Sequence, residues 1–163
     1  MPAIATARAA TETMVGMGEA SAVHAPDRLW SILGSCVAVV IYDPHQRIGA
    51  MGHIVLPSAA GRQGNPAKFA DTAVPHLLHL LKQKGASGEG LVAKLAGGAR
   101  MFGKSALMEV GEGNVQAILH ALQAARIRVA GKDVGGSRGR RVTLDCSQGS
   151  LLVQVLGNPP LTL

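Results

Sequence analysis

The chain has 163 residues, of which 47% are hydrophobic and 16% charged, so it has the size and composition of one folded domain and not of a disordered segment. Its formal charge of +6 suggests an acidic partner, but with 2% aromatic residues it lacks the stacking side chains that single-stranded nucleic-acid binders use. No run reaches the about 20 apolar residues of a membrane-spanning helix. The N-terminus lacks the pattern of a secretory signal, so we expect a cytoplasmic protein with reduced cysteines.

In chain order, the sequence predicts more strands than helices, without strict alternation of the two. Residues 1–12 are expected to form a flexible tail, and residues 13–163 a single domain. The expected strands are 14–23, 32–42, 49–56, 91–96, 127–130, 141–146 and 151–156. The expected helices are 71–84, capped near Asp71, and 114–125, with Asn114 as its N-cap. This pattern indicates the α+β class, as a layered α/β/β sandwich of mixed sheets with two main helices.

The segment 33–57 carries the most chemistry. Cys36 follows the small residues Gly34 and Ser35 and opens an apolar strand, and His53 lies in the next extended segment after a short turn. Two such strands can bring a thiol and an imidazole together for thiol-based acyl transfer. A lone cysteine is more often a small buried hydrophobe, but its position at a loop-to-strand junction favours the catalytic interpretation.

Seven blocks of sequence together resemble one known family. They are Leu33-Gly34-Ser35-Cys36-Val37-Ala38-Val39, Asp43-Pro44, Gly49-Ala50-Met51-Gly52-His53, Lys68 to Val74, Lys94 to Phe102, Gly111-Glu112-Gly113-Asn114-Val115 and Asp133 to Arg140. In order and spacing they resemble the CheD chemoreceptor glutamine deamidases over nearly all of residues 14–156.

The resemblance implies an enzyme that hydrolyses glutamine side-chain amides to glutamate on methyl-accepting chemotaxis receptors. It places the nucleophile at Cys36 and the histidine at His53. A hydroxyl residue shortly before the cysteine is the usual third member; Ser31 is the nearest one here, and Trp30 is the other residue that the motif could place there. Backbone N–H groups near Gly34 and Ser35 would stabilise the oxyanion. Receptor methylesterase activity would be a side reaction of the same acyl-enzyme, and a CheC-like phosphatase is a further expected partner.

Three alternatives remain open from the sequence. The protein could be a non-catalytic adaptor that binds the phosphatase or a receptor, or an amine could replace water as the acyl acceptor. Third, the basic residues Lys132, Arg138, Arg140 and Arg141 could form a rim around Cys36 that steers association with an acidic receptor.

Other potential sites give weaker signals. Cys146 lies on the apolar face of its expected strand and is interpreted as core. His76 and His79 are three residues apart on a helix, but nothing nearby completes a metal site, so no metal or other cofactor is expected.

Overall fold

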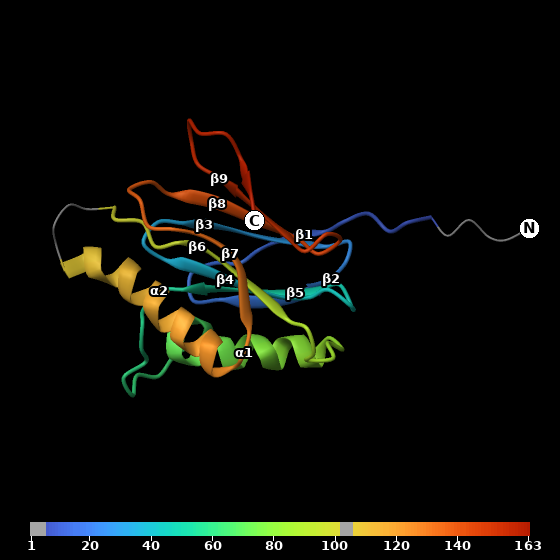
Figure 1. Ribbon diagram of the computed structural model, residues 1–163, viewed down its shortest axis with the longest axis horizontal. Helices are drawn as coiled ribbons and strands as arrows, with labels where there is room; N and C mark the ends of the chain where they lie inside the picture. The colour runs from blue at the N-terminus through green and yellow to red at the C-terminus, as the bar shows by residue number, and fades with distance from the viewer. Residues whose placement is uncertain (1–5, 102–105) are drawn as a thin grey trace, which may run out of the picture.

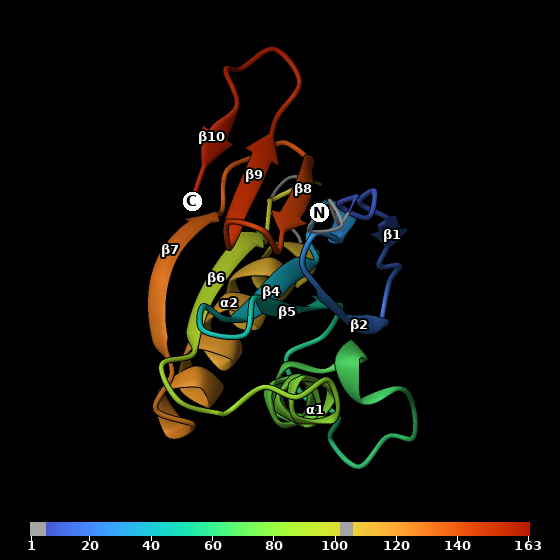
Figure 2. The same ribbon diagram turned by 90° about the vertical axis from the view of Figure 1, so that its right-hand side faces the viewer.

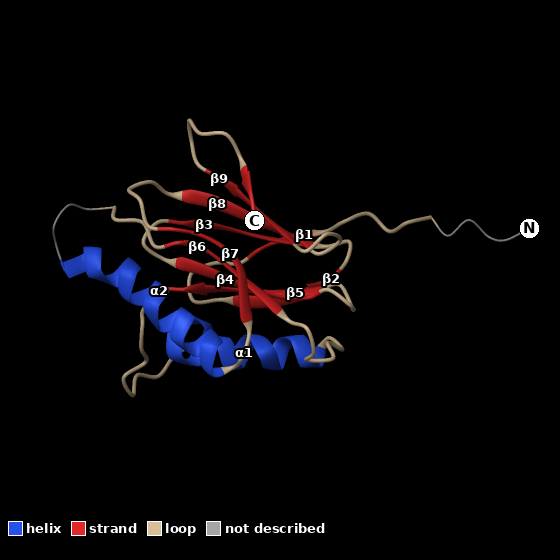
Figure 3. Ribbon diagram, viewed as in Figure 1, coloured by secondary structure: helices blue, strands red, loops and turns tan. Residues whose placement is uncertain are grey.

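The computed structural model describes residues 6–101 and 106–163. In this part of the chain, ten strands form two five-stranded sheets, and two helices cover the outer face of one of them. Figures 1 and 3 show the resulting three layers, with the helices below and the sheets stacked above them. The predicted α/β/β sandwich of mixed sheets is therefore confirmed.

The sheet next to the helices has the strand order β2-β5-β4-β6-β7. Its strands are β2 (Ala20–His24), β5 (Ile48–Ile54), β4 (Val37–Asp43), β6 (Val92–Gly97) and β7 (Arg128–Val134). The β6–β7 pair is parallel and the other pairs are antiparallel. Every residue of β4 is buried, because helices cover one face of this strand and the second sheet covers the other.

The second sheet has the order β1-β3-β8-β9-β10 and carries no helix on its outer face. Its strands are β1 (Glu12–Met14), β3 (Arg28–Leu33), β8 (Arg140–Asp145), β9 (Ser150–Gln154) and β10 (Leu161–Thr162). Figure 2 shows β8, β9 and β10 extending beyond the helices. Side chains alternate along β3: Leu29, Ser31 and Leu33 are buried between the sheets, whereas Ile32 faces solvent.

Helix α1 (Ala70–Gln83) follows the short 3₁₀ helix η1 (Pro66–Lys68) and packs on the first sheet through Val74, Leu77 and Leu81. The helix was predicted within one residue, and of the two caps that the sequence allows, Asp71 or a residue on the Lys68 side, the structure has the second. Phe69 occupies the N-cap position, and the Asp71 carboxylate accepts hydrogen bonds from Ser58 and from the backbone of Ala59. Asp71 thereby holds the start of the segment between β5 and η1.

Helix α2 (Ala106–Ala124) begins well before the predicted position, and Asn114 lies inside it and not at its N-cap. Helix α2 uses Gly111 for close packing: a Cβ there would lie 2.9 Å from the carbonyl oxygen of Gly98. The buried Asn114 side chain donates to the carbonyl of Val55 at 3.0 Å and ties α2 to the end of β5.

Two predicted strands are each divided between the sheets. The predicted strand 14–23 is β1 and β2, and 32–42 spans the end of β3 and all of β4. The glycine-containing segments 15–19 and 34–36 carry the chain from one sheet to the other, which alternating hydrophobicity alone does not reveal. The remaining strands agree with prediction to within a few residues. Of the expected tail, residues 1–5 lie outside the described residues, 6–11 have no regular structure, and Glu12 already pairs in β1.

Candidate active site

Cys36 lies in the 34–36 crossing, immediately before β4, and is half-buried. Its side chain packs against the apolar cluster between the two sheets. The Cys36 side chain is therefore partly accessible to solvent, and its packing against this cluster holds it in place.

His53 lies on β5, where it pairs with Ala38 of β4. Ala38 belongs to the apolar cluster between the sheets, and Cys36, two residues before it, packs against the same cluster. His53 is only 3% exposed. Its backbone is held on both sides, by a bond from its N–H to the carbonyl of Glu19 and one from Gly18 N–H to its own carbonyl.

Ser31 reaches the same place from the other sheet. It is completely buried on β3, and its Oγ lies 2.8 Å from His53 Nδ1. The hydroxyl donates to the carbonyl oxygen of Val15 at 2.7 Å, and that same oxygen lies 3.2 Å from His53 Nδ1.

These contacts assign the tautomer of His53. A carbonyl oxygen only accepts, so the Nδ1 of His53 beside Val15 must carry the proton. The Ser31 hydroxyl already donates to Val15, which leaves its lone pair to accept from Nδ1. The Nε2 atom of His53 therefore has the free lone pair that a general base needs.

Burial sets the charge state of the pair. It lowers the pKa of His53 below its ordinary value of 6.5, against smaller opposing effects of the Val15 hydrogen bond and the charge of Glu19. Burial also raises the pKa of the Cys36 thiol above 9.0. Both shifts favour the neutral form, of the thiol and of the imidazole.

The backbone of the 34–36 crossing is bonded to the segment after β6. The carbonyl of Gly34 accepts from Ala99 N–H at 3.0 Å, and the carbonyl of Cys36 accepts from Gly98 N–H at 2.9 Å. Because the C=O and the following N–H of a trans peptide point in opposite directions, the Ser35 N–H points away from Ala99. It has no partner among the hydrogen bonds of residues 6–101 and 106–163.

The sequence pointed to Ser31, Cys36 and His53, and the structure gathers them at one end of the sandwich. It did not point to Val15, because a backbone carbonyl leaves no chemical signature in a sequence. The pair Gly97-Gly98 was noted only as unlike a phosphate loop. Two successive glycines directly after a strand were the available signal that the backbone approaches another segment closely there.

Two of the four residues of the predicted basic rim, Lys132 and Arg138, are exposed, and the other two make contacts elsewhere. Arg140 is only 7% exposed and pairs with Asp133 inside the protein. Arg141 lies over the ring of Trp30, 4.2 Å from its centroid, on the outer face of the second sheet. Met101 packs beside Gly34 of the crossing, and Met17 precedes the Gly18 that binds His53.

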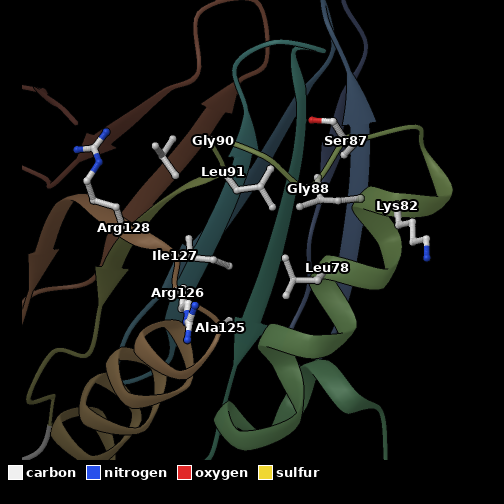
Figure 4. A pocket seen from close by; sticks show the side chains of 13 residues that line it. Leu78, Lys82, Ser87, Gly88, Gly90, Leu91, Ala125, Arg126, Ile127 and Arg128 are labelled. Atoms are coloured by element: carbon white, nitrogen blue, oxygen red, sulfur yellow. The ribbon is translucent and has the colours of Figure 1, made fainter.

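Cys146 is fully buried between the sheets, as predicted, and both cysteines are free thiols. The larger hollows lie elsewhere. One of about 890 Å³ is lined by residues of α1 and α2, and another of about 710 Å³ opens at the C-terminal ends of the helices, where Lys82 and Arg128 point away from each other (Figure 4). Among the described residues, no three metal-ligating side chains gather, and no helix is long and apolar enough to cross a membrane.

Comparison with known proteins agrees with the earlier resemblance. The family model described as CheD chemotactic sensory transduction matches residues 55–155. A protein of Thermotoga maritima named chemoreceptor glutamine deamidase CheD is 42% identical over 145 residues, covering 88% of this chain and 92% of that protein. Two further relatives are named probable chemoreceptor glutamine deamidase CheD. The one from Clostridium botulinum (strain Eklund 17B / Type B) is 37% identical, covering 90% of this chain and 94% of that protein. The one from Methanococcus maripaludis (strain C6) is 39% identical, covering 86% of this chain and 92% of that protein. The residues matched by the family model do not include Cys36 or His53, so this match does not depend on them. The chain belongs to the CheD family.

Proposed function

We propose that this protein hydrolyses the side-chain amide of glutamines on methyl-accepting chemotaxis receptors, with Cys36 as nucleophile and His53 as general base and acid. The relatives' names support the reaction and the type of substrate. The observation that carries the mechanism is the hydrogen bond of His53 Nδ1 to Ser31, since it leaves Nε2 free to act as a base, and Cys36 packs against the cluster between the same two sheets.

In the first half-reaction, His53 Nε2 takes the proton of the Cys36 thiol, and the sulfur attacks the carboxamide carbon. The negative charge moves to the carbonyl oxygen, where the Ser35 N–H is the donor best placed to bind it; a single such donor contributes about 3 kcal/mol to transition-state stability. As the carbon–nitrogen bond breaks, the imidazolium returns its proton to the nitrogen. Ammonia leaves, and a thioester with Cys36 remains.

In the second half-reaction, His53 removes a proton from water, and the resulting hydroxide attacks the thioester carbon. The carbon–sulfur bond breaks, the sulfur recovers the proton from His53, and glutamate is released. Ser31 and Val15 share the charge that His53 carries in each half-reaction, since both accept from Nδ1. A glutamate methyl ester would enter the same thioester with methanol as leaving group, which accounts for a methylesterase side reaction.

The receptor would meet exposed apolar side chains at this site. Met17 is 71% exposed and Met101 41%, although large apolar side chains are ordinarily covered. Flexible thioether side chains adapt to differing surfaces, which suits an enzyme that reaches several glutamines. We expect these two residues to contact the side chains that flank the reactive glutamine.

The experiment is peptide mass spectrometry of a chemoreceptor cytoplasmic fragment after incubation with the protein, scoring glutamine-to-glutamate conversion. Cys36→Ala and His53→Gln run in parallel, and circular dichroism checks that each variant folds. Conversion by the wild type alone supports the proposal. Conversion by folded Cys36→Ala would remove Cys36 from the mechanism. Receptor binding without conversion by the wild type would favour the adaptor, with a CheC-like phosphatase as the partner to seek.

A further inference from the structure

We propose that the buried ion pair of Asp133 and Arg140 is a positioning element for the nucleophile: it holds the Cys36 crossing in its reactive geometry through a single peptide group. This inference rests on the proposed function for its kinetic consequence. Its structural basis, and one of its two measurements, do not involve the receptor at all.

Three atoms of the Arg140 guanidinium have separate partners. Nε donates to the Asp133 carboxylate at 2.9 Å, Nη2 to the carbonyl of Gly135 at 2.6 Å, and Nη1 to the carbonyl of Gly97 at 3.0 Å. The guanidinium thus joins the turn between β7 and β8 to the end of β6. The rigid planar fork makes these bonds simultaneously, which a lysine ammonium cannot do with the same geometry.

The Gly97 carbonyl belongs to the same peptide group as the Gly98 N–H, and that N–H donates to the carbonyl of Cys36 at 2.9 Å. One peptide therefore accepts at one end from the Arg140 cation and from the Gly135 N–H at 2.9 Å, and donates at the other end to the backbone of Cys36. Hydrogen bonds in such a chain polarise and strengthen one another. Displacement of the guanidinium would weaken the bond that fixes Cys36.

The glycines at this contact are required by the closeness of the two segments. Gly97 has φ +114° and Gly98 φ +67°, a backbone region that favours glycine. A Cβ on Gly97 would overlap the carbonyl oxygen of Cys36. Two further bonds join the same segments: Ala99 N–H to the Gly34 carbonyl, and Arg100 N–H to the Gly136 carbonyl at 2.8 Å.

The placement assigns a role to two sequence blocks that the chemistry does not otherwise use, namely 94–102 and 133–140. They are distant in the chain but meet directly behind the Cys36 crossing. Asp133 is the counter-charge that makes a buried Arg140 tolerable, because an unpaired guanidinium there would be strongly destabilising. Arg140 contacts no substrate in this arrangement and acts only through the backbone.

The test compares Arg140→Lys with Arg138→Lys in the full chain. Arg138 is the matched control, because it lies on the same turn but donates to Leu156 at the surface and has no bond to the 97–100 segment. The first measurement is the rate of Cys36 alkylation by iodoacetamide from pH 6 to 9, read by peptide mapping. The second is kcat and KM on the receptor fragment.

We expect Arg140→Lys to lower both the alkylation rate and kcat by between about tenfold and 100-fold with KM nearly unchanged, as for a small misplacement of a reacting group. Arg138→Lys should stay within about twofold of wild type in both, as a surface substitution that leaves the crossing untouched. Wild-type alkylation and kcat in folded Arg140→Lys would overturn the proposal.

Two further variants separate positioning from loss of stability. Leu81→Ala removes a buried side chain of α1, in the cluster between the helices and the first sheet, and should lower Tm while leaving Cys36 alkylation unchanged below the transition. An equal slowing in Leu81→Ala would overturn the proposal. If Arg140→Lys does not fold, Arg140→Met should show the same loss of alkylation, since it removes the buried charge and leaves only Asp133, whose side chain is 31% exposed, without its partner. A wild type that converts no glutamine would refute the proposed function, while the alkylation series would still decide the positioning role.

Discussion

Ser31 and His53 belong to different sheets, and their side chains meet between the two layers with Oγ 2.8 Å from Nδ1. The contact joins the sandwich halves at the same end as Cys36. Its partners are fixed before any substrate arrives, because the Val15 carbonyl accepts from both residues. The base is therefore oriented by the packing of the sheets.

Removing the Ser31 hydroxyl should slow the reaction without preventing it. A hydrogen bond to a charged group contributes about 1.5–3 kcal/mol, so Ser31→Ala should lower kcat by between about tenfold and 100-fold. Steady-state kinetics on a receptor fragment measures this. Ser31→Thr keeps the hydroxyl and should retain most of the activity; an Ala variant as active as the Thr variant would exclude an orienting role.

The plot of kcat/KM against pH should rise at acidic pH and then reach a broad plateau. The reaction needs neutral His53, whose pKa is lowered from 6.5, so kcat/KM should rise with pH at values below 6.5 and level off by neutrality. Loss of the thiol proton comes only above 9.0, because burial raises the pKa of Cys36. A kcat/KM profile measured in constant-ionic-strength buffers checks both limbs. An acid limb centred above 7 would show that His53 is not the base.

The two cysteines should differ sharply in reactivity. Cys36 is half-buried beside a histidine, whereas Cys146 is fully buried and burial raises its pKa to about 12. Iodoacetamide at pH 8 should modify Cys36 alone in the folded protein, and both cysteines in denaturant. The matched control is His53→Gln, which should slow the modification of Cys36. Faster labelling of Cys146 than of Cys36 would contradict this prediction.

Shortening the exposed methionines should weaken receptor binding more than catalysis. Met17→Ala and Met101→Ala each remove apolar contact area worth about 1 kcal/mol, so KM should rise roughly fivefold, with kcat changed less than twofold. Leu156→Ala is the control, because Leu156 is 94% exposed but lies on the β9–β10 connection. Unchanged KM in the double methionine variant would place the receptor elsewhere.

Raising the ionic strength should leave kcat/KM nearly constant. Steering by a basic rim would make it fall, but Arg140 is buried in an ion pair and Arg141 is stacked on Trp30. A salt titration of the initial rate from 50 to 500 mM, with the fragment below its KM, measures this. A steep decrease would restore electrostatic steering and direct attention to other surface charges.

Local pattern was sufficient for elements whose signal lies within one segment. The apolar face of α1 and the turn between β4 and β5 follow from periodicity and turn residues; α1 and the two strand ends at that turn were predicted to within one residue. Pattern failed where glycine has a tertiary role. Gly111 and Gly113 resemble a helix start but lie within α2, where the backbone of Gly98 leaves no room for a side chain at position 111.

The sequence by itself determined the fold class, the family resemblance, and Cys36 and His53 as the candidate reacting pair, since these depend on residue type and on spacing over a short turn. Only the tertiary structure decided which partners orient them. Ser31 reaches His53 because the chain changes sheets at 34–36, and Val15 contributes a backbone oxygen that any residue would supply. The tertiary structure also decided that Arg140 is buried, because the fold places its counter-charge, Asp133, beside it.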